Sequence, residues 1–205
     1  MSSGSEARRG RPRSAGADER IIRVAIELLL ARGYGGLSPD EVAERAGVAK
    51  TTLYRRWPSK GHLALAVVAR LQEYDEIPDT GDIRRDLTVY LGEIAVALNR
   101  MRLAGAAEGS RSPGTVAELV AAAARDDELD RLRRELYERR NALAIALIER
   151  AVRRGQLRPD LDPGVLLEQL AGALYYRVLI TGAPVDEEYA ARLVASALDG
   201  ATTAE

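Results

Sequence analysis

The segment 38–60 constrains the fold most, because it carries the start and end signals of two very short helices. Ser38 can cap the amide three residues later, and Glu41 can reach back to the serine, as in a capping box. Pro39 stands at the first helical position, where its missing N–H removes no hydrogen bond. These signals predict a helix over 40–46 with a sharply defined beginning.

A glycine turn and a second short helix follow. Gly47 suits the left-handed backbone that ends a helix, and Val48 offers an apolar contact directly after it. The next helix is predicted over 49–56, because the residue before a proline is pushed out of helical backbone and Trp57-Pro58 therefore stops it. Two short helices joined by such a turn are typical of a helix-turn-helix motif.

The rest of the 205-residue chain also predicts helices. Apolar side chains recur at spacings of three and four residues, strand signals are scarce, and 46% of the residues are hydrophobic, which is enough for a sizeable core. We therefore expect an all-α protein of about nine helices, with an N-terminal three-helix helix-turn-helix domain followed by a helical bundle. The other helices are expected at about 19–32 with Asp18 as cap, from Ser59 to Tyr74, and at about 82–103, 115–124, 126–154, 163–181 and 186–198.

Charge divides the chain unevenly. Residues 1–60 contain 12 Lys and Arg against 7 Asp and Glu, a balance of +5, whereas residues 61–205 contain 18 against 24, a balance of −6. A basic head on an acidic body favours a polyanion as the partner of the head. Chance unevenness is the alternative interpretation. The two lysines of the chain, Lys50 and Lys60, both fall in the head.

The second short helix has the side chains that a DNA major groove requires. Lysine and arginine can donate to guanine O6 and N7, and a threonine methyl can pack against the thymine methyl. The residues predicted to contact bases are Lys50, Thr51, Thr52 and Arg55. Helix starts and hydroxyls suit phosphates, which predicts phosphate contacts at Ser38 and Lys60. The alternative is that these polar side chains form only solvated faces and caps.

Residues 1–17 consist mainly of Ser, Gly, Ala, Arg and Pro, which predicts a disordered basic arm. Its segment Arg-Arg-Gly-Arg-Pro-Arg resembles the core of AT-hook peptides. Extended arginines fit the narrow minor groove of A·T-rich DNA, so we expect Arg9, Arg11 and Arg13 to enter that groove beside the helix-turn-helix. A solubilising or non-specifically basic tail is the alternative.

Segment 19–71 resembles the DNA-binding domain of the tetracycline-repressor (TetR) family. The resemblance rests on Ala43, Gly47-Val48, Thr52-Leu53-Tyr54 and Pro58-Ser59-Lys60, which lead into an apolar helix. It implies that Tyr54 and Lys60 touch phosphates, and that Arg56 contributes a contact to the DNA backbone. Gly61 departs from the family pattern, in which an acid is frequent at this position.

The resemblance also implies a regulatory body. It divides the chain into a DNA-binding domain at 18–60 and a ligand-binding and dimerisation domain at 61–205. The implied protein is a homodimeric repressor that binds a pseudo-palindromic operator in double-stranded DNA and is released by a small hydrophobic or amphipathic ligand. Candidate ligand contacts are Tyr90, Met101 and Tyr137, which serve equally well as core residues. The predicted dimer contacts, on helices that could also be ordinary core helices, are Leu170, Leu174, Leu193 and Leu198.

Composition disfavours several other functions. The chain has no cysteine, which excludes disulfides and thiolate chemistry, and its single histidine, His62, disfavours a metal site. We expect no cofactor, no metal and no enzymatic activity. No apolar run approaches the roughly 20 residues that span a bilayer, and the polar N-terminus lacks a secretory signal, so a cytoplasmic location is expected. Two alternatives stay open: a regulator or architectural DNA-binding protein without a small-molecule ligand, and an all-helical enzyme.

Overall fold

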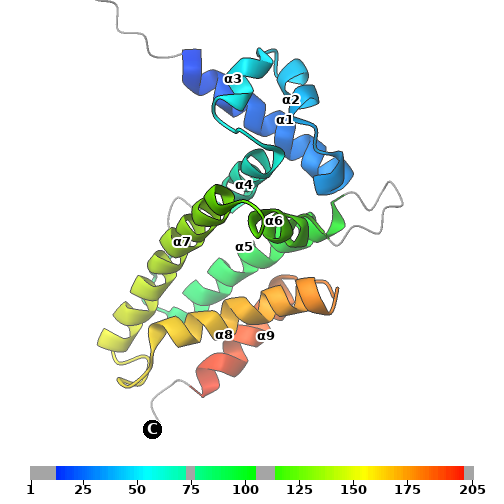
Figure 1. Ribbon diagram of the computed structural model, residues 1–205. Helices are drawn as coiled ribbons and strands as arrows, with labels where there is room; N and C mark the ends of the chain where they lie inside the picture. The colour runs from blue at the N-terminus through cyan, green and yellow to red at the C-terminus, as the bar shows by residue number, and fades with distance from the viewer. Residues whose placement is uncertain (1–12, 73–76, 105–113, 201–205) are drawn as a thin grey trace, which may run out of the picture.

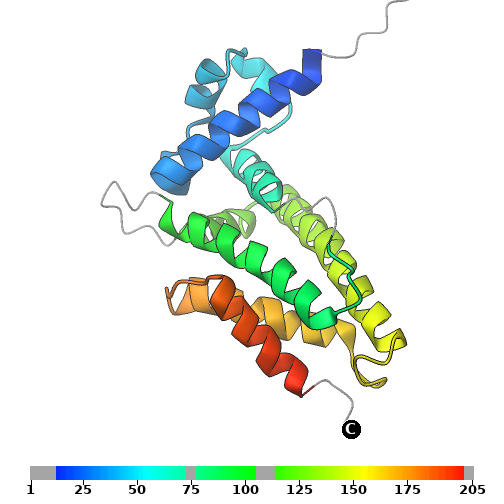
Figure 2. The same ribbon diagram turned by 180° about the vertical axis from the view of Figure 1, so that it is seen from behind.

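The computed structural model describes residues 13–72, 77–104 and 114–200, in which nine α-helices and one π-helix form a head and a body (Figure 1). Helices α1 to α3 form the small head, and α4 leads from it into a larger body built from α5 to α9 (Figure 2). The described residues contain no strand, so the predicted all-α class is confirmed. The elements are α1 (Arg13–Gly36), α2 (Pro39–Arg45), α3 (Lys50–Tyr54), α4 (Lys60–Leu71), α5 (Ile83–Leu103), α6 (Thr115–Ala123), α7 (Asp127–Arg153), α8 (Pro163–Tyr175), η2 (Tyr176–Ile180) and α9 (Glu187–Asp199).

Apolar faces of the three head helices close over a shared core. Its fully buried side chains include Ile21, Leu28, Val42 and Leu53. Ser38 caps α2 as predicted, because its hydroxyl accepts the Glu41 N–H at 3.3 Å. The Glu41 carboxylate does not complete the capping box, since it pairs with Arg32 of α1 at 2.8 Å. That ion pair ties α2 to α1 instead.

The first helix begins earlier than the sequence predicted. Helix α1 starts at Arg13, so residues 13–17 are helical and Asp18 is not a cap. Alanine favours helices strongly, and this stretch contains no proline to stop one. Asp18 lies within α1 and forms an ion pair with Arg56. At the other end the helix breaks at Gly33, where a φ of 69° is backbone that glycine adopts readily, and this agrees with the predicted helix end at about residue 32.

The body is held together chiefly by α9 packing along α5, with α8 in contact with both α7 and α9 (Figure 1). Aspartates that accept backbone N–H groups begin four of its helices: Asp82, Asp126, Asp162 and Asp186. The helix predicted over 163–181 is divided. Its last part is the π-helix η2, in which the Thr181 N–H donates to the carbonyl oxygen of Tyr176, five residues earlier.

Helix α4 joins the head to the body. Ser59 caps it by accepting a backbone N–H of its first turn. Gly61 is buried, and a β-carbon at this position would lie 2.5 Å from a methyl group of Leu129 in α7. The glycine therefore allows α4 and α7 to approach closely. Helix α4 ends at Leu71, and Tyr74, its predicted end, lies outside the described residues.

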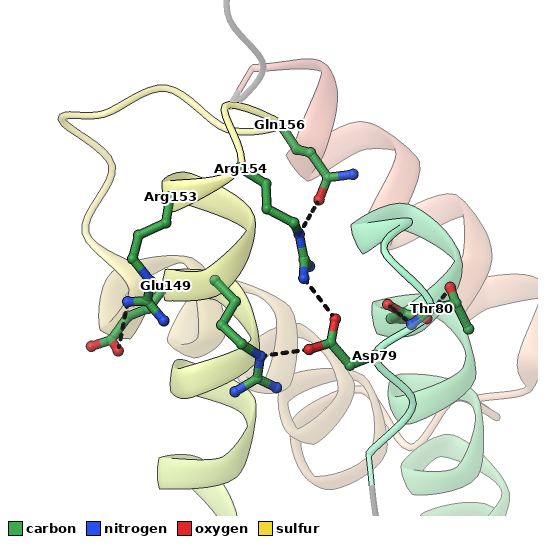
Figure 3. A network of polar contacts seen from close by, with 8 residues as sticks. Asp79, Thr80, Glu149, Arg153, Arg154 and Gln156 are labelled. Carbon is green, nitrogen blue, oxygen red and sulfur yellow. Dashed lines mark hydrogen bonds and ion pairs between the residues drawn. The ribbon is translucent and has the colours of Figure 1, made fainter.

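Arginines clamp the segment before α5 against the end of α7 (Figure 3). Asp79 accepts hydrogen bonds from Arg150 Nε at 2.6 Å and from Arg154 Nη1 at 2.9 Å. The buried Asp86 accepts two more hydrogen bonds, from the hydroxyl of Thr80 at 2.7 Å and from the backbone N–H of Thr80 at 2.9 Å. These bonds fix the segment that carries Ile77, which lines a cleft between head and body.

Candidate functional site

Helix α3 separates an apolar back from a polar front. Leu53 is fully buried, and Val48 and Trp57 are half-buried against the core. The solvent-facing side chains are Lys50, Thr51, Tyr54 and Arg55, with Thr52 partly covered. Cations and hydroxyls therefore lie on the side that a DNA duplex can reach, which is the arrangement a groove-docking helix requires.

Asp40, at the start of α2, holds two of the predicted DNA contacts. Lys50 Nζ donates to Asp40 Oδ2 at 2.5 Å, and the Tyr54 hydroxyl donates to Oδ1 at 3.0 Å. These hydrogen bonds lower the pKa of Asp40 and raise the pKa values of Lys50 and Tyr54. A DNA phosphate would compete with this carboxylate for the same donors. No local pattern indicates this pairing, because its partners lie on different helices.

Lys60 is anchored to the end of α1. Its ammonium donates to the carbonyl oxygen of Gly35 at 2.7 Å and lies 4.7 Å from the centre of the Tyr34 ring. Partial burial lowers the pKa of Lys60. Ser38 is engaged in capping α2 and Arg56 in an ion pair within the head. The phosphate contacts of these residues stay predictions.

The basic arm lies almost entirely outside the described residues. Arg9 and Arg11 belong to that part of the chain, and their minor-groove contacts stay a prediction. Arg13 is the first residue of α1. Residues 13–17 of the predicted arm are therefore helical, whereas the arm over residues 1–12 stays a prediction.

A cleft of about 1020 Å³ opens between the head and the body. Helix α1 and Trp57 contribute its head-side wall, whereas α4, α7 and the start of the segment before α5 contribute its body-side wall. Apolar lining residues include Ile22, Ile26, Ala69, Leu136 and Leu143. Of the predicted ligand contacts, Tyr90 lines this cleft. Met101 is fully buried in the core, and neither Met101 nor Tyr137 is among the lining residues.

A polar cluster lies on the body side of the cleft. Arg140 Nη1 donates to Gln72 Oε1 at 2.5 Å, and Nη2 donates to the Tyr175 hydroxyl at 3.4 Å. The Tyr175 hydroxyl donates to that of Tyr137 at 3.2 Å, and the guanidinium lies 4.7 Å from the centre of the Tyr137 ring. Burial is the main cause of the raised pKa values of Tyr90 and Tyr137. Sequence reasoning missed this cluster because Gln72 and Arg140 are 68 positions apart.

Comparisons with known proteins cover both parts of the chain. Residues 21–67 match bacterial regulatory proteins of the tetR family, and residues 77–197 match the tetracyclin repressor-like C-terminal domain. The uncharacterized HTH-type transcriptional regulator YdeS of Bacillus subtilis is 32% identical over 197 residues, which is 95% of this chain and 94% of that protein. The chain belongs to the TetR family. It is therefore a DNA-binding transcriptional regulator and not an enzyme.

Other TetR-family proteins agree along nearly the whole length. The DNA-binding transcriptional repressor TetR of Mycobacteroides abscessus is 34% identical over 189 residues, covering 91% of this chain and 92% of that protein. The crystal structure of the TetR family transcription regulator SCO0332 matches with a TM-score of 0.72 at 38% identity, over 91% of this chain and 99% of that one. A TetR regulator from Haloarcula marismortui, 18% identical, shares the fold with a TM-score of 0.69 over 92% and 100% of the two chains.

The dimer contacts that the TetR resemblance predicted need correction. Leu170, Leu174 and Leu198 are fully buried inside the protomer, so a partner cannot touch them. Leu193 is half-buried and also packs against the core. A leucine repeat marks the face that a helix buries, but it does not distinguish burial within one chain from burial against a second.

Large apolar side chains are exposed on the face of α8 and η2 that points away from the buried Leu170 and Leu174. Val165, Tyr176 and Ile180 have 49%, 60% and 71% of their surface exposed. Gly172 lies on the same helix, is exposed, and has no atom within 4 Å of the place its β-carbon would take. This face is therefore open to a second molecule.

The described helices include neither a metal-binding cluster nor a membrane span. No three His, Asp or Glu side chains in the described ranges gather closely enough to hold a metal ion. None of these helices combines the length and apolarity that crossing a bilayer needs.

Proposed function

We propose that this TetR-family regulator is a dimeric repressor, which binds a pseudo-palindromic operator and leaves it when a small molecule occupies the cleft. The proposal is carried by the front of α3, where Lys50, Thr51 and Arg55 are exposed while Leu53 is buried behind them. In a two-fold dimer the second copy would present the same side chains to the other half-site.

Repression is favoured by the names of the relatives. The repressor of Mycobacteroides abscessus is similar over 91% of this chain. The activator FasR of Mycolicibacterium smegmatis, in contrast, is similar over 31% of it. The whole-length similarity therefore supports a repressor, whereas the similarity to an activator covers less than a third of the chain.

The homodimer would form through the exposed face of α8 and η2, together with α9. Val165, Tyr176 and Ile180 would leave water on association, which is the main favourable term in such contacts. The exposed Gly172 would let the partner helix approach closely, because it adds no side chain to the contact.

Release by a ligand would follow from the two walls of the cleft. A ligand that fits one arrangement of head and body better than another shifts the population toward that arrangement. Trp57 lines the cleft and follows directly after α3. A movement of this wall would change the spacing of the two α3 helices in the dimer, and with it the fit to both half-sites.

Selection from random DNA duplexes tests the DNA-binding part of the proposal. The wild-type protein should return a consensus with two-fold symmetry. Lys50→Ala or Thr51→Ala should change the preferred bases, because each lost base contact removes about 1–3 kcal/mol of discrimination. Arg153→Ala, at the far end of α7 and 66% exposed, should return the wild-type consensus. Failure to enrich any symmetric sequence would contradict the proposal.

Light scattering of the purified chain tests the dimer. Ile180→Glu should be monomeric, because a carboxylate in an apolar contact loses its hydration without a partner. Its operator affinity should fall by about 100-fold or more, because one half-site is lost. Leu103→Glu, a matched control at a side chain that is 49% exposed on α5, should stay dimeric. A dimeric Ile180→Glu protein would reject this interface.

A further inference from the structure

The polar cluster of the cleft contains a buried cation without an anion. Arg140 and Gln72 are only 8% and 6% exposed, and both line the cleft. Among the described residues, no carboxylate lies within 4.0 Å of the Arg140 guanidinium, whose hydrogen bonds go to neutral oxygens. A buried charge is costly unless an opposite charge compensates it. An anion that entered the cleft would supply that compensation.

The donors left over in the cluster match a planar oxyanion. Arg140 Nε and Gln72 Nε2 are buried and lack a hydrogen-bond partner among the described residues. Arg140 Nη2 makes a long bond of 3.4 Å to the Tyr175 hydroxyl. Nε and Nη2 share one edge of the guanidinium, and their parallel N–H bonds fit the two oxygens of a carboxylate. Gln72 Nε2 is a third unpartnered donor of the same cluster, on the amide that accepts from Arg140 Nη1.

The remainder of the cleft fits an apolar group. Its walls carry aliphatic side chains from α1, α4 and α7, and Trp57 lines the head side. The volume of about 1020 Å³ is far larger than a carboxylate needs and is at the upper end of ordinary ligand sites. Besides Arg140, the charged lining residues are Arg23, Arg70 and Arg139 against Asp18 and Glu19. Cationic side chains therefore outnumber anionic ones around the cleft, which favours the approach of an anion.

We propose that the cleft binds an amphipathic organic acid, whose carboxylate is held by Arg140 and Gln72 and whose apolar part extends toward Trp57. The inference rests on the proposed ligand response and specifies the chemical class of the inducer. Arg140 is the specificity-determining residue, because it distinguishes an acid from an alcohol or an amine with the same apolar part.

Calorimetric titration of the full chain tests the anion site with octanoate as the probe. Octan-1-ol and octyltrimethylammonium have the same tail and serve as neutral and cationic controls. Octanoate should bind the wild-type protein at least tenfold more tightly than either, since hydrogen bonds to a charged group contribute about 1.5–3 kcal/mol. Arg140→Gln should weaken octanoate binding by about 10–100-fold and leave octan-1-ol unchanged. Arg153→Gln, an arginine of α7 that is 66% exposed and does not line the cleft, should bind octanoate like the wild type.

Folding and function are read separately. Arg140→Gln and its control variant should both melt cooperatively and bind the selected operator in the absence of octanoate. Arg140→Lys, which keeps the charge but lacks the planar fork, should bind octanoate with intermediate affinity. Equal affinity for octanoate and octan-1-ol, no octanoate binding by the wild type, or full octanoate binding by Arg140→Gln would overturn the inference. If octanoate binds through Arg140 but does not release the operator, the anion site stands and the proposed induction fails.

Discussion

Cationic side chains of the head and of the body differ in their exposure and in the charge of their partners. In the head, Lys50 and Arg56 lie near the surface, and each is paired with a carboxylate, that of Asp40 or Asp18. In the body, Arg140 is buried, and the described residues give it neutral partners only. An exposed ion pair contributes about 0–1 kcal/mol, so a DNA phosphate can replace its carboxylate at little cost. A buried charge without a counter-ion costs several kcal/mol, so an anionic ligand gains much by supplying one.

The largest effect on this comparison should come from removing the buried cation while its amide partner stays in place. Arg140→Met alone leaves Gln72 buried without a partner, and we expect a loss of about 1–3 kcal/mol in the free energy of unfolding. The double variant with Gln72→Leu removes the unpaired amide as well, and it should be at least as stable as the wild type. Chemical denaturation of the ligand-free protein measures both values. A double variant less stable than Arg140→Met would show that the cluster stabilises the fold.

Removing the anchored ammonium of Lys60 in the head should have a smaller effect, which appears in operator binding and not in stability. Lys60→Ala should weaken operator binding about tenfold and flatten the salt dependence by about one phosphate contact, with equal losses on every sequence. Fluorescence anisotropy over a salt series measures both quantities, with Arg153→Ala as the control. An unchanged salt slope would remove Lys60 from the phosphate contacts.

The smallest expected effect sharpens the comparison at Asp40. Asp40→Asn should raise operator affinity by about three- to tenfold, because it frees Lys50 and Tyr54 and removes a negative charge facing DNA. The stability should change by less than about 0.5 kcal/mol. Asp199→Asn, which breaks an exposed ion pair of the body, should leave DNA binding unchanged. A weaker affinity of Asp40→Asn would show that Asp40 orients the two donors instead of competing for them.

The pH dependence of operator affinity provides a second test of the role of Asp40. Hydrogen bonds from Lys50 and Tyr54 lower the pKa of Asp40, so its carboxylate stays charged further into the acid range than an ordinary one. Acidifying the wild-type protein to about pH 4, where an ordinary aspartate with a pKa of about 3.9 is roughly half protonated, should therefore not reproduce half of the affinity gain of Asp40→Asn.

Local features of the fold were predictable from the sequence because their partners are a few residues apart. Ser38, Ser59 and Asp186 cap helices by accepting an N–H three residues later, and each stands where the sequence placed a helix start. The apolar back and polar front of α3 follow in the same way from residues within two turns of each other. Three local features were missed: the start of α1, the partner of the Glu41 carboxylate and the π-helical end of the helix predicted over 163–181.

Features that depend on distant residues were not predictable. The bond between Gln72 and Arg140 joins α7 to the end of α4, and neither residue belongs to a recognisable motif. The same limitation led to the correction at Leu170, because the apolar repeat of α8 does not tell which neighbour covers it. Met101 was assigned to a ligand site for a similar reason, since core and cavity residues share one composition.

Trp57 is the single tryptophan of the chain, and it lines the cleft directly after α3. Indole emission moves to shorter wavelength when its surroundings become less polar, and tyrosines emit at shorter wavelength than indole. The protein therefore has an intrinsic optical reporter where the proposed ligand cleft meets α3. A titration monitored at this one fluorophore would follow the filling of the cleft in an unlabelled, unmodified chain, and stopped-flow mixing would give the rate at which the signal reaches the DNA-facing side.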